Sequence, residues 1–189
     1  MALTAALRCA PRAARPPLRT QGYALAAFSN SSTGPDVMKL PSWIASVKQY
    51  RDSNTWLLPD PNADVRALQD PASRGRAIGC WYASCTNFVD VWMDASAEAA
   101  GLWWQLAVYL VDYDYGQASH ENLRPRQATV ALLNMHSLEN AAPVQYLDNY
   151  VGGAWVVFEL NTSARIRVSQ LQGDNAVVSA VMFDAVSAL

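Results

Sequence analysis

Few residues of this chain could do chemistry, and they form no catalytic signature. The 189 residues include two histidines, His120 and His136, and both fall in stretches that read as loops. The sequence contains no nucleophile-elbow, zinc-protease, phosphate-loop or dinucleotide-binding pattern. Catalysis needs a nucleophile or a base together with a group that orients it. We therefore predict that the protein is not an enzyme, and a hydrolase of unrecognised type is the least favoured alternative.

Three aspartates form a candidate metal site. Asp112 and Asp114 lie two residues apart at the end of an expected strand, so their side chains share one face, and Asp184 closes the last expected strand. Carboxylate oxygens are common calcium ligands. The pattern is compatible with a structural calcium ion, and an ion pair or a turn-capping role explains it equally well. No other cofactor is expected.

Four aromatic residues form the candidate binding surface. Phe88 and Trp92 flank Asp90 on one face of an expected strand, and Trp103 and Trp104 precede the next strand. Four such rings close together on the outside would make a larger apolar patch than a solitary soluble protein usually exposes. A protein partner or a stacked sugar ring would cover it, unless the chain's own loops bury the rings.

Strands must position these side chains. Residues 64–114 hold three apolar segments of strand length, parted by Pro, Gly, Ser and Asp. Side chains alternate between two faces in residues 87–93 and 106–111, and residues 40–47 are expected to be extended although Trp43, Val47 and Tyr50 have helical spacing. Further strands are expected at 23–28, 56–58, 128–133, 154–160, 164–169 and 175–183, with an exposed loop at 115–125.

About nine or ten such strands predict an all-β fold, an antiparallel two-sheet β-sandwich that occupies residues 20–189 as one domain. The expected core consists of Val89, Val91, Leu106, Val108, Leu110, Ile166, Val168, Val177 and Val181.

The chain also resembles a known module. The segments TQG (20–22), DVRALQDP (64–71), GRAIGCWYAS (75–84), the expected strand Val89–Met93, QLAVYLVDYD (105–114), GGAWVVFEL (152–160), ARIRVS (164–169) and DNAVVSAVMFD (174–184) occur in the order found in a module that recurs in large, secreted, multi-domain bacterial proteins. That module is similar to galactose-binding-like β-sandwiches, the jelly-roll class that includes many carbohydrate-binding modules. The resemblance covers nearly everything after residue 20. It implies a jelly-roll fold, and it says little about activity.

The resemblance adds to both candidate sites. The relatives carry a similar Asp–aromatic–Asp run followed by an arginine, a place that Arg126 takes here. They tend to have small or polar residues on the outward face, where this chain has large rings. That departure favours a binding partner for the aromatic residues.

Charge and composition exclude several function classes. The net charge is −2, and without the four arginines of the first nineteen residues the remainder has ten basic and sixteen acidic residues, or −6. A nucleic-acid binder would have the opposite charge, and no apolar run is long enough to span a bilayer. Cysteine is scarce and odd in number, and Cys80 and Cys85 have a spacing that would turn them to opposite faces of a strand. These features indicate a reducing compartment.

Residues 1–19 are rich in Ala, Arg and Pro and lack acids, which is typical of an organelle transit peptide; a retained basic arm that lies on a partner is the alternative. We expect a mitochondrial or plastid location if the segment is cleaved and a cytoplasmic or ciliary one if it is kept. The expected function is that of an architectural, protein-binding subunit of a larger intracellular assembly, such as a ciliary axoneme or a mitochondrial complex. A carbohydrate-binding module is the main alternative.

Overall fold

The structure is a computed structural model that describes residues 6–8, 21–28, 36–50, 53–59, 64–69, 71, 75–83, 85–115 and 124–186. Sheet A has the strand order β1 (Ala6–Arg8), β12 (Ala154–Leu160), β9 (Trp104–Leu110), β15 (Ala180–Ala185), β2 (Gly22–Leu25) and β3 (Val37–Lys39). Sheet B has the order β11 (Gln145–Leu147), β10 (Gln127–Asn134), β13 (Ala164–Gln172), β8 (Phe88–Ala95) and β4 (Ile44–Gln49). Sheet C has the order β14 (Val177–Val178), β7 (Arg76–Ala83) and β5 (Ser53–Pro59), and β6 (Leu68–Gln69) also pairs with β7.

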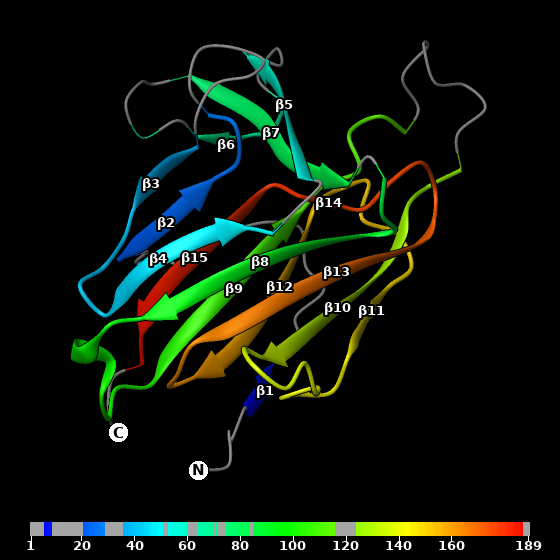
Figure 1. The fold of residues 1–189 in the computed structure, drawn as a ribbon. Coiled ribbons are helices and arrows are strands. Elements are labelled where there is room, and N and C mark those ends of the chain that lie inside the picture. The colour runs from blue at the N-terminus through cyan, green and yellow to red at the C-terminus, as the bar shows by residue number, and fades with distance from the viewer. Residues whose placement is uncertain are drawn as a thin grey trace.

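The prediction of an antiparallel two-sheet β-sandwich is confirmed. Sheets A and B form the two layers, and β5, β6 and β7 of the small sheet C lie together at the upper end of the view in Figure 1. All strand pairs among the described residues are antiparallel. A single one-turn 3-10 helix, Ala97–Ala99, interrupts the strands in that part of the chain.

The core between sheets A and B follows the alternation in the sequence. Val89, Val91 and Met93 of β8 face it, as do Leu106 and Val108 of β9, and all are fully buried. Each of the nine core residues predicted from the sequence is buried. Successive strand residues point to opposite faces, so the alternate residues Phe88, Asp90 and Trp92 lie on the outer side of β8.

Strand β9 is buried on both faces, since sheet C covers part of the other side of sheet A. Ala107, Tyr109 and Val111 belong to a second hydrophobic cluster, together with Leu57 of β5 and Ile78 of β7. Burial on both faces explains why residues 106–111 read as a continuous apolar run and not as an apolar–polar alternation.

The last apolar segment differs from the prediction of a single strand over 175–183. Its first part, β14, pairs with β7 in sheet C, and its second part, β15, pairs with β9 and β2 in sheet A. Between them, the Ser179 N–H donates to the Tyr109 carbonyl at 2.8 Å, and the Ser179 carbonyl accepts from the Ala26 N–H at 3.0 Å. These hydrogen bonds pair the backbone groups of Ser179 where the chain passes from sheet C to sheet A. One apolar run therefore contributes a strand to each of the two sheets.

Other expected segments are placed as follows. Residues 44–49 form β4, so the extended interpretation of this region holds in place of the helical one, and the first expected strand ends early because Ala27 takes a left-handed φ of 56°. Of residues 1–19, Ala6–Arg8 pair with β12 at the edge of sheet A; the others, and residues 116–123 with His120, lie outside the described residues. No helix in the described part is long and apolar enough to cross a membrane.

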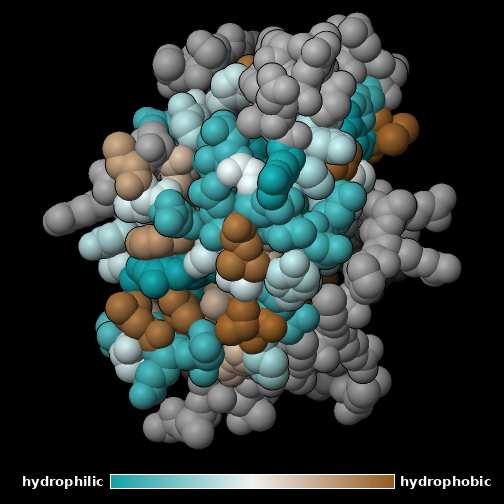
Figure 2. Space-filling model, turned by 90° about the vertical axis from the view of Figure 1, so that its right-hand side faces the viewer, coloured by the Kyte–Doolittle hydropathy of each residue, from teal (hydrophilic) through white to brown (hydrophobic). Residues whose placement is uncertain are grey.

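The side of the molecule at the right of Figure 1 is mostly hydrophilic. Figure 2 shows this side, where the hydrophobic side chains form separate groups with hydrophilic ones between them. Large exposed hydrophobic residues do occur in the described chain, among them Leu138, Val144 and Leu171.

Candidate functional site

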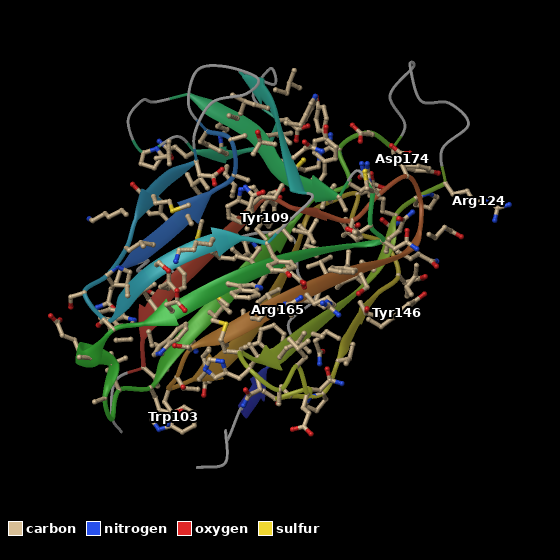
Figure 3. The ribbon with its side chains drawn as sticks, in the orientation of Figure 1. Trp103, Tyr109, Arg124, Tyr146, Arg165 and Asp174 are labelled. Carbon is tan, nitrogen blue, oxygen red and sulfur yellow. The ribbon has the colours of Figure 1, made fainter. Side chains whose placement is uncertain are left out.

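The outer face of sheet B carries an aromatic and charged ladder. Phe88, Asp90 and Trp92 of β8 point away from the core, and the register places Arg167 opposite Asp90 and Arg165 opposite Trp92 on β13. Tyr50 follows β4 and joins them. We call these six residues the aromatic–arginine face. Figure 3 shows Arg165 over the middle of the sheet.

Asp90 holds the ladder together. Its carboxylate is buried and accepts hydrogen bonds from Nη2 of Arg165 and from Nε and Nη2 of Arg167, the latter two at 2.9 Å. The hydrogen bond from Arg167 to Asp90 raises the pKa of that guanidinium against the opposing effect of burial. A buried carboxylate without such partners would be strongly unfavourable, so the two arginines are what permit Asp90 at this position.

The rings lie over the guanidinium groups. The Arg167 guanidinium carbon lies 4.1 Å from the centre of the Phe88 ring, and that of Arg165 lies 5.2 Å from the Trp92 ring. Tyr50 and Trp92 stack with centroids 4.9 Å apart and an angle of 5° between their planes. These are cation–π and stacking distances. These contacts hold the side chains of the face against one another.

The four predicted aromatic residues do not form one patch. Trp104 is fully buried in the core, where its ring centre lies 5.9 Å from that of Phe183, so its expected outward position is wrong. The reason is parity: Trp104 is two residues before Leu106 and shares its inward face. Trp103 is half-buried, and Figure 3 places it at the lower edge, well away from Arg165.

Sequence reasoning found only part of the face. The alternation in residues 164–169 sends Ile166 and Val168 inward, and so it already turned Arg165 and Arg167 outward. The alternation did not indicate that Tyr50 would join the two arginines, because spacing along one strand does not show which strand pairs with β4.

The second region is an aspartate–arginine cluster formed by Asp112, Asp114, Arg126 and Asn175. The Arg126 backbone N–H donates to Asp112 at 2.8 Å, and its Nη1 donates to the other oxygen of that carboxylate. Its Nη2 donates to Asp114 Oδ2 at 2.7 Å and to Asn175 Oδ1 at 2.9 Å. Burial acts to lower the pKa of Arg126, but the bonds and charges of the two aspartates outweigh it and raise that pKa.

The cluster is the ion pair that the sequence left open beside the calcium interpretation. Asp184 does not join it: its carboxylate accepts the Gln21 backbone N–H at 2.8 Å, and it lies opposite Gln105 on β9. Gln105 precedes Asp112 by seven residues, about 23 Å along a strand. Among the described residues no group of three or more His, Cys, Asp or Glu side chains could hold a metal ion.

A pocket of about 200 Å³ lies beside the cluster, at the end of the sandwich near the labelled Asp174 and Arg124 in Figure 3. Its lining includes the aromatic side chains Trp56, Tyr82 and Tyr113 and the polar side chains Asp114, Asn175 and Ser179. The ring centres of Trp56 and Tyr113 are 6.4 Å apart. Cys80 also lines it, and burial raises the pKa of this thiol to about 12.

The pocket had no local signal in the sequence, because its side chains come from segments far apart in the chain. Comparison with protein-family models, with curated proteins and with solved structures found no match for this chain. The case for function therefore rests on the geometry of the two regions.

Proposed function

We propose that this protein is a non-catalytic, architectural β-sandwich that binds a protein partner through the aromatic–arginine face. The observation that supports this is the composition of the face. Trp, Tyr and Arg are the residues that most often dominate the binding energy of protein interfaces. Here all three types meet on the outer side of sheet B, where Tyr50 is 37% exposed and Phe88, Trp92 and Arg167 are half-exposed, while Asp90 and Arg165 are buried.

The rigidity of the face favours binding. Ordering a flexible side chain at an interface costs about 0.5–1.5 kcal/mol. Stacking between Tyr50 and Trp92, and the ion pairs of Asp90 with both arginines, fix these side chains within the isolated chain. A partner would then bind with little further loss of side-chain entropy.

The charge of the face indicates the chemistry of the partner. Two guanidinium groups surround one carboxylate, so the ladder carries a net charge of +1, although the whole chain carries −2. We propose a protein surface that offers an apolar side chain to the rings and a carboxylate to Arg167. Complementary charges of this kind raise the rate and specificity of association.

The setting we propose is a larger intracellular assembly such as a ciliary axoneme or a mitochondrial complex, and the fold family is the galactose-binding-like jelly roll. Both proposals are supported by the sequence resemblance and composition alone. The location follows the fate of residues 1–19, as set out above.

The test is co-migration of the chain with a large complex in size-exclusion chromatography of native extract. We expect Trp92→Ala and Phe88→Ala to reduce co-migration by tenfold or more, about 1.4 kcal/mol per tenfold. Tyr146→Ala is the control, because this exposed ring lies apart from Arg165 in Figure 3. Thermal unfolding of each variant separates lost binding from lost folding.

Two results would count against the proposal. Unchanged co-migration of both folded variants would exclude this face as the docking surface. Unchanged co-migration together with lost retention on a glycan column would assign the rings to carbohydrate binding, which is the alternative function.

A further inference from the structure

The geometry points to a second binding site, in the pocket beside the aspartate–arginine cluster, for a methylated ammonium group carried by a small molecule or by a modified lysine side chain. The site shares no residue with the aromatic–arginine face, so the inference stands independently of the proposed protein partner. It rests on the aromatic side chains of the pocket, on the net charge of the cluster, and on the single free carboxylate oxygen that the cluster offers.

The pocket has an aromatic wall. Trp56, Tyr82 and Tyr113 line it, and Trp56 is 37% exposed. The ring centres of Trp56 and Tyr113 lie 6.4 Å apart, with an angle of 37° between the two planes, so one small group in the pocket can contact both rings. The face of an aromatic ring attracts a cation within about 6 Å of its centre, and Trp does so most strongly. The wall therefore favours a cation that also has an apolar surface.

The charge of the cluster favours a cation over an anion. Asp112 and Asp114 together contribute −2 and Arg126 contributes +1, so the cluster carries a net charge of −1. Arg126 is 3% exposed, whereas Asp114 is 30% exposed and lines the pocket. Asp114 accepts from Arg126 through Oδ2, and its Oδ1 has no hydrogen-bond partner among the described residues. A cation would lie against this carboxylate, and an anion would be repelled by it.

The other charged residues near the pocket do not balance that negative charge. The Arg66 guanidinium carbon lies 4.9 Å from the centre of the Tyr113 ring, but Asp64 binds the same guanidinium at 2.6 Å, so this pair is neutral. Arg124 and Asp174, which Figure 3 labels at this end of the sandwich, are exposed and have opposite charges. The net charge at the pocket is thus set by the cluster.

The hydrogen-bonding groups select a methylated ammonium among the cations. A calcium ion needs about six to eight oxygen ligands, and no group of three or more His, Cys, Asp or Glu in the described part of the chain could hold a metal. A primary ammonium has three N–H donors, but Asp114 offers one free oxygen and the side-chain oxygen of Asn175 already accepts from Arg126. A trimethylated ammonium has no N–H donor, so it loses no hydrogen bond when it leaves water.

The pocket is preorganised and has a suitable size. Arg126 holds Asp114 at 2.7 Å, and the buried Asp112 fixes Arg126 in turn. Gly173, at φ +95°, lies against Arg126, and a Cβ there would come within 2.7 Å of its side chain. The volume of about 200 Å³ equals that of roughly six or seven water molecules at about 30 Å³ each, which accommodates a trimethylammonium head of about five non-hydrogen atoms.

The experiment is ligand-observed NMR with the full chain. The probes are choline, its neutral carbon analogue in which a tert-butyl group replaces the trimethylammonium group, and a short peptide with either trimethylated or unmodified lysine. We expect choline or the trimethyllysine peptide to bind with a Kd below about 10 mM. The neutral analogue and the unmodified peptide should bind about tenfold more weakly or worse, because they lack the charge or the methyl groups.

Three variants test the assignment to the pocket. Trp56→Ala should weaken binding by about tenfold or more, and Trp56→Phe, which keeps a ring, should weaken it less. Asp114→Asn keeps the size of the side chain and removes its charge, and it should also weaken binding by about tenfold. Trp92→Ala on the aromatic–arginine face is the matched control and should leave binding unchanged. Thermal unfolding shows which variants are folded, and Trp56→Phe replaces Trp56→Ala if the latter is not.

Each outcome decides the inference. Binding of choline or of the trimethyllysine peptide that the changes at Trp56 and Asp114 weaken, and that Trp92→Ala spares, supports it; the probe that binds more tightly identifies the source of the ammonium group. Equal binding of the neutral analogue would overturn the role of charge. Loss of binding in Trp92→Ala alone would move the cation to the aromatic–arginine face, and binding of neither ammonium probe would overturn the site.

Discussion

Removing Asp112 should destabilise the protein far more than removing Asp114, although both carboxylates bind the same guanidinium. The side chain of Asp112 is 1% exposed and that of Arg126 3%, whereas Asp114 is 30% exposed. In Asp112→Ala, Arg126 stays buried with one carboxylate fewer, and its backbone N–H loses its acceptor. Breaking a buried ion pair in this way costs about 3–5 kcal/mol.

Asp114→Ala should cost only about 1 kcal/mol, because water can approach its side of the guanidinium and Asp112 remains. For a chain of this length about 1 kcal/mol lowers Tm by roughly 2–4 °C. We therefore expect Tm to fall by about 6–20 °C in Asp112→Ala and by about 2–4 °C in Asp114→Ala. Urea unfolding gives the free energies directly, and an unchanged slope against urea shows that the comparison is valid.

The same assay tests the calcium interpretation. Because a guanidinium already lies between the two carboxylates, calcium or a chelator should leave the Tm of the unmodified protein unchanged. Equal losses for the two variants would refute the reasoning from burial. A rise in Tm with calcium that saturates, and that Asp114→Ala abolishes, would show that the carboxylates bind a metal ion.

Three further predictions follow from burial and packing. Trp104→Ala should lower the free energy of unfolding by about 3–5 kcal/mol, whereas Trp103→Ala, at the half-buried neighbour, should lower it by about 1–2 kcal/mol. Urea unfolding measures both values, and similar losses for the two variants would contradict the core position of Trp104. Gly79→Ala should cost about 1–3 kcal/mol by thermal unfolding, because the added methyl group meets the backbone carbonyl of the turn after β2; an unchanged Tm would contradict that close approach. Cys80 should alkylate at pH 8 more slowly than the exposed Cys85, because burial raises the pKa of the Cys80 thiol to about 12 and the thiolate is the reactive form. Peptide mass spectrometry should find Cys85 labelled first, and labelling in the reverse order would contradict this prediction.

Period-two alternation predicted the sandwich core because each core strand has one face that must be buried. It placed Val89 and Val91 inward and Phe88 and Trp92 outward, and the same rule, applied two residues further back along β9, would have placed Trp104 inward. The rule carries no information about which strands become neighbours.

Because alternation does not show which strands become neighbours, the sequence did not predict the features that depend on strand pairing. The last apolar run divides at Ser179 because its two halves find partners in different sheets, and no local pattern marks the division. The pocket combines Trp56, Asp114 and Asn175, which are brought together only when the sheets assemble. Tertiary pairing is the source of both the pocket and the part that Tyr50 plays on the outer face.

The position of β15 in sheet A has a consequence for synthesis. This strand, at residues 180–185, lies between β9 and β2, so the sheet has a gap in its middle until these residues leave the ribosome. Until then β2 and β3 cannot join the layer, and β9 has an unpaired edge. Sheet A can therefore close only after residues 180–185 have been synthesised, and until then the unpaired strand edges of the nascent chain favour aggregation. Chaperone dependence during expression is the behaviour that this strand order favours.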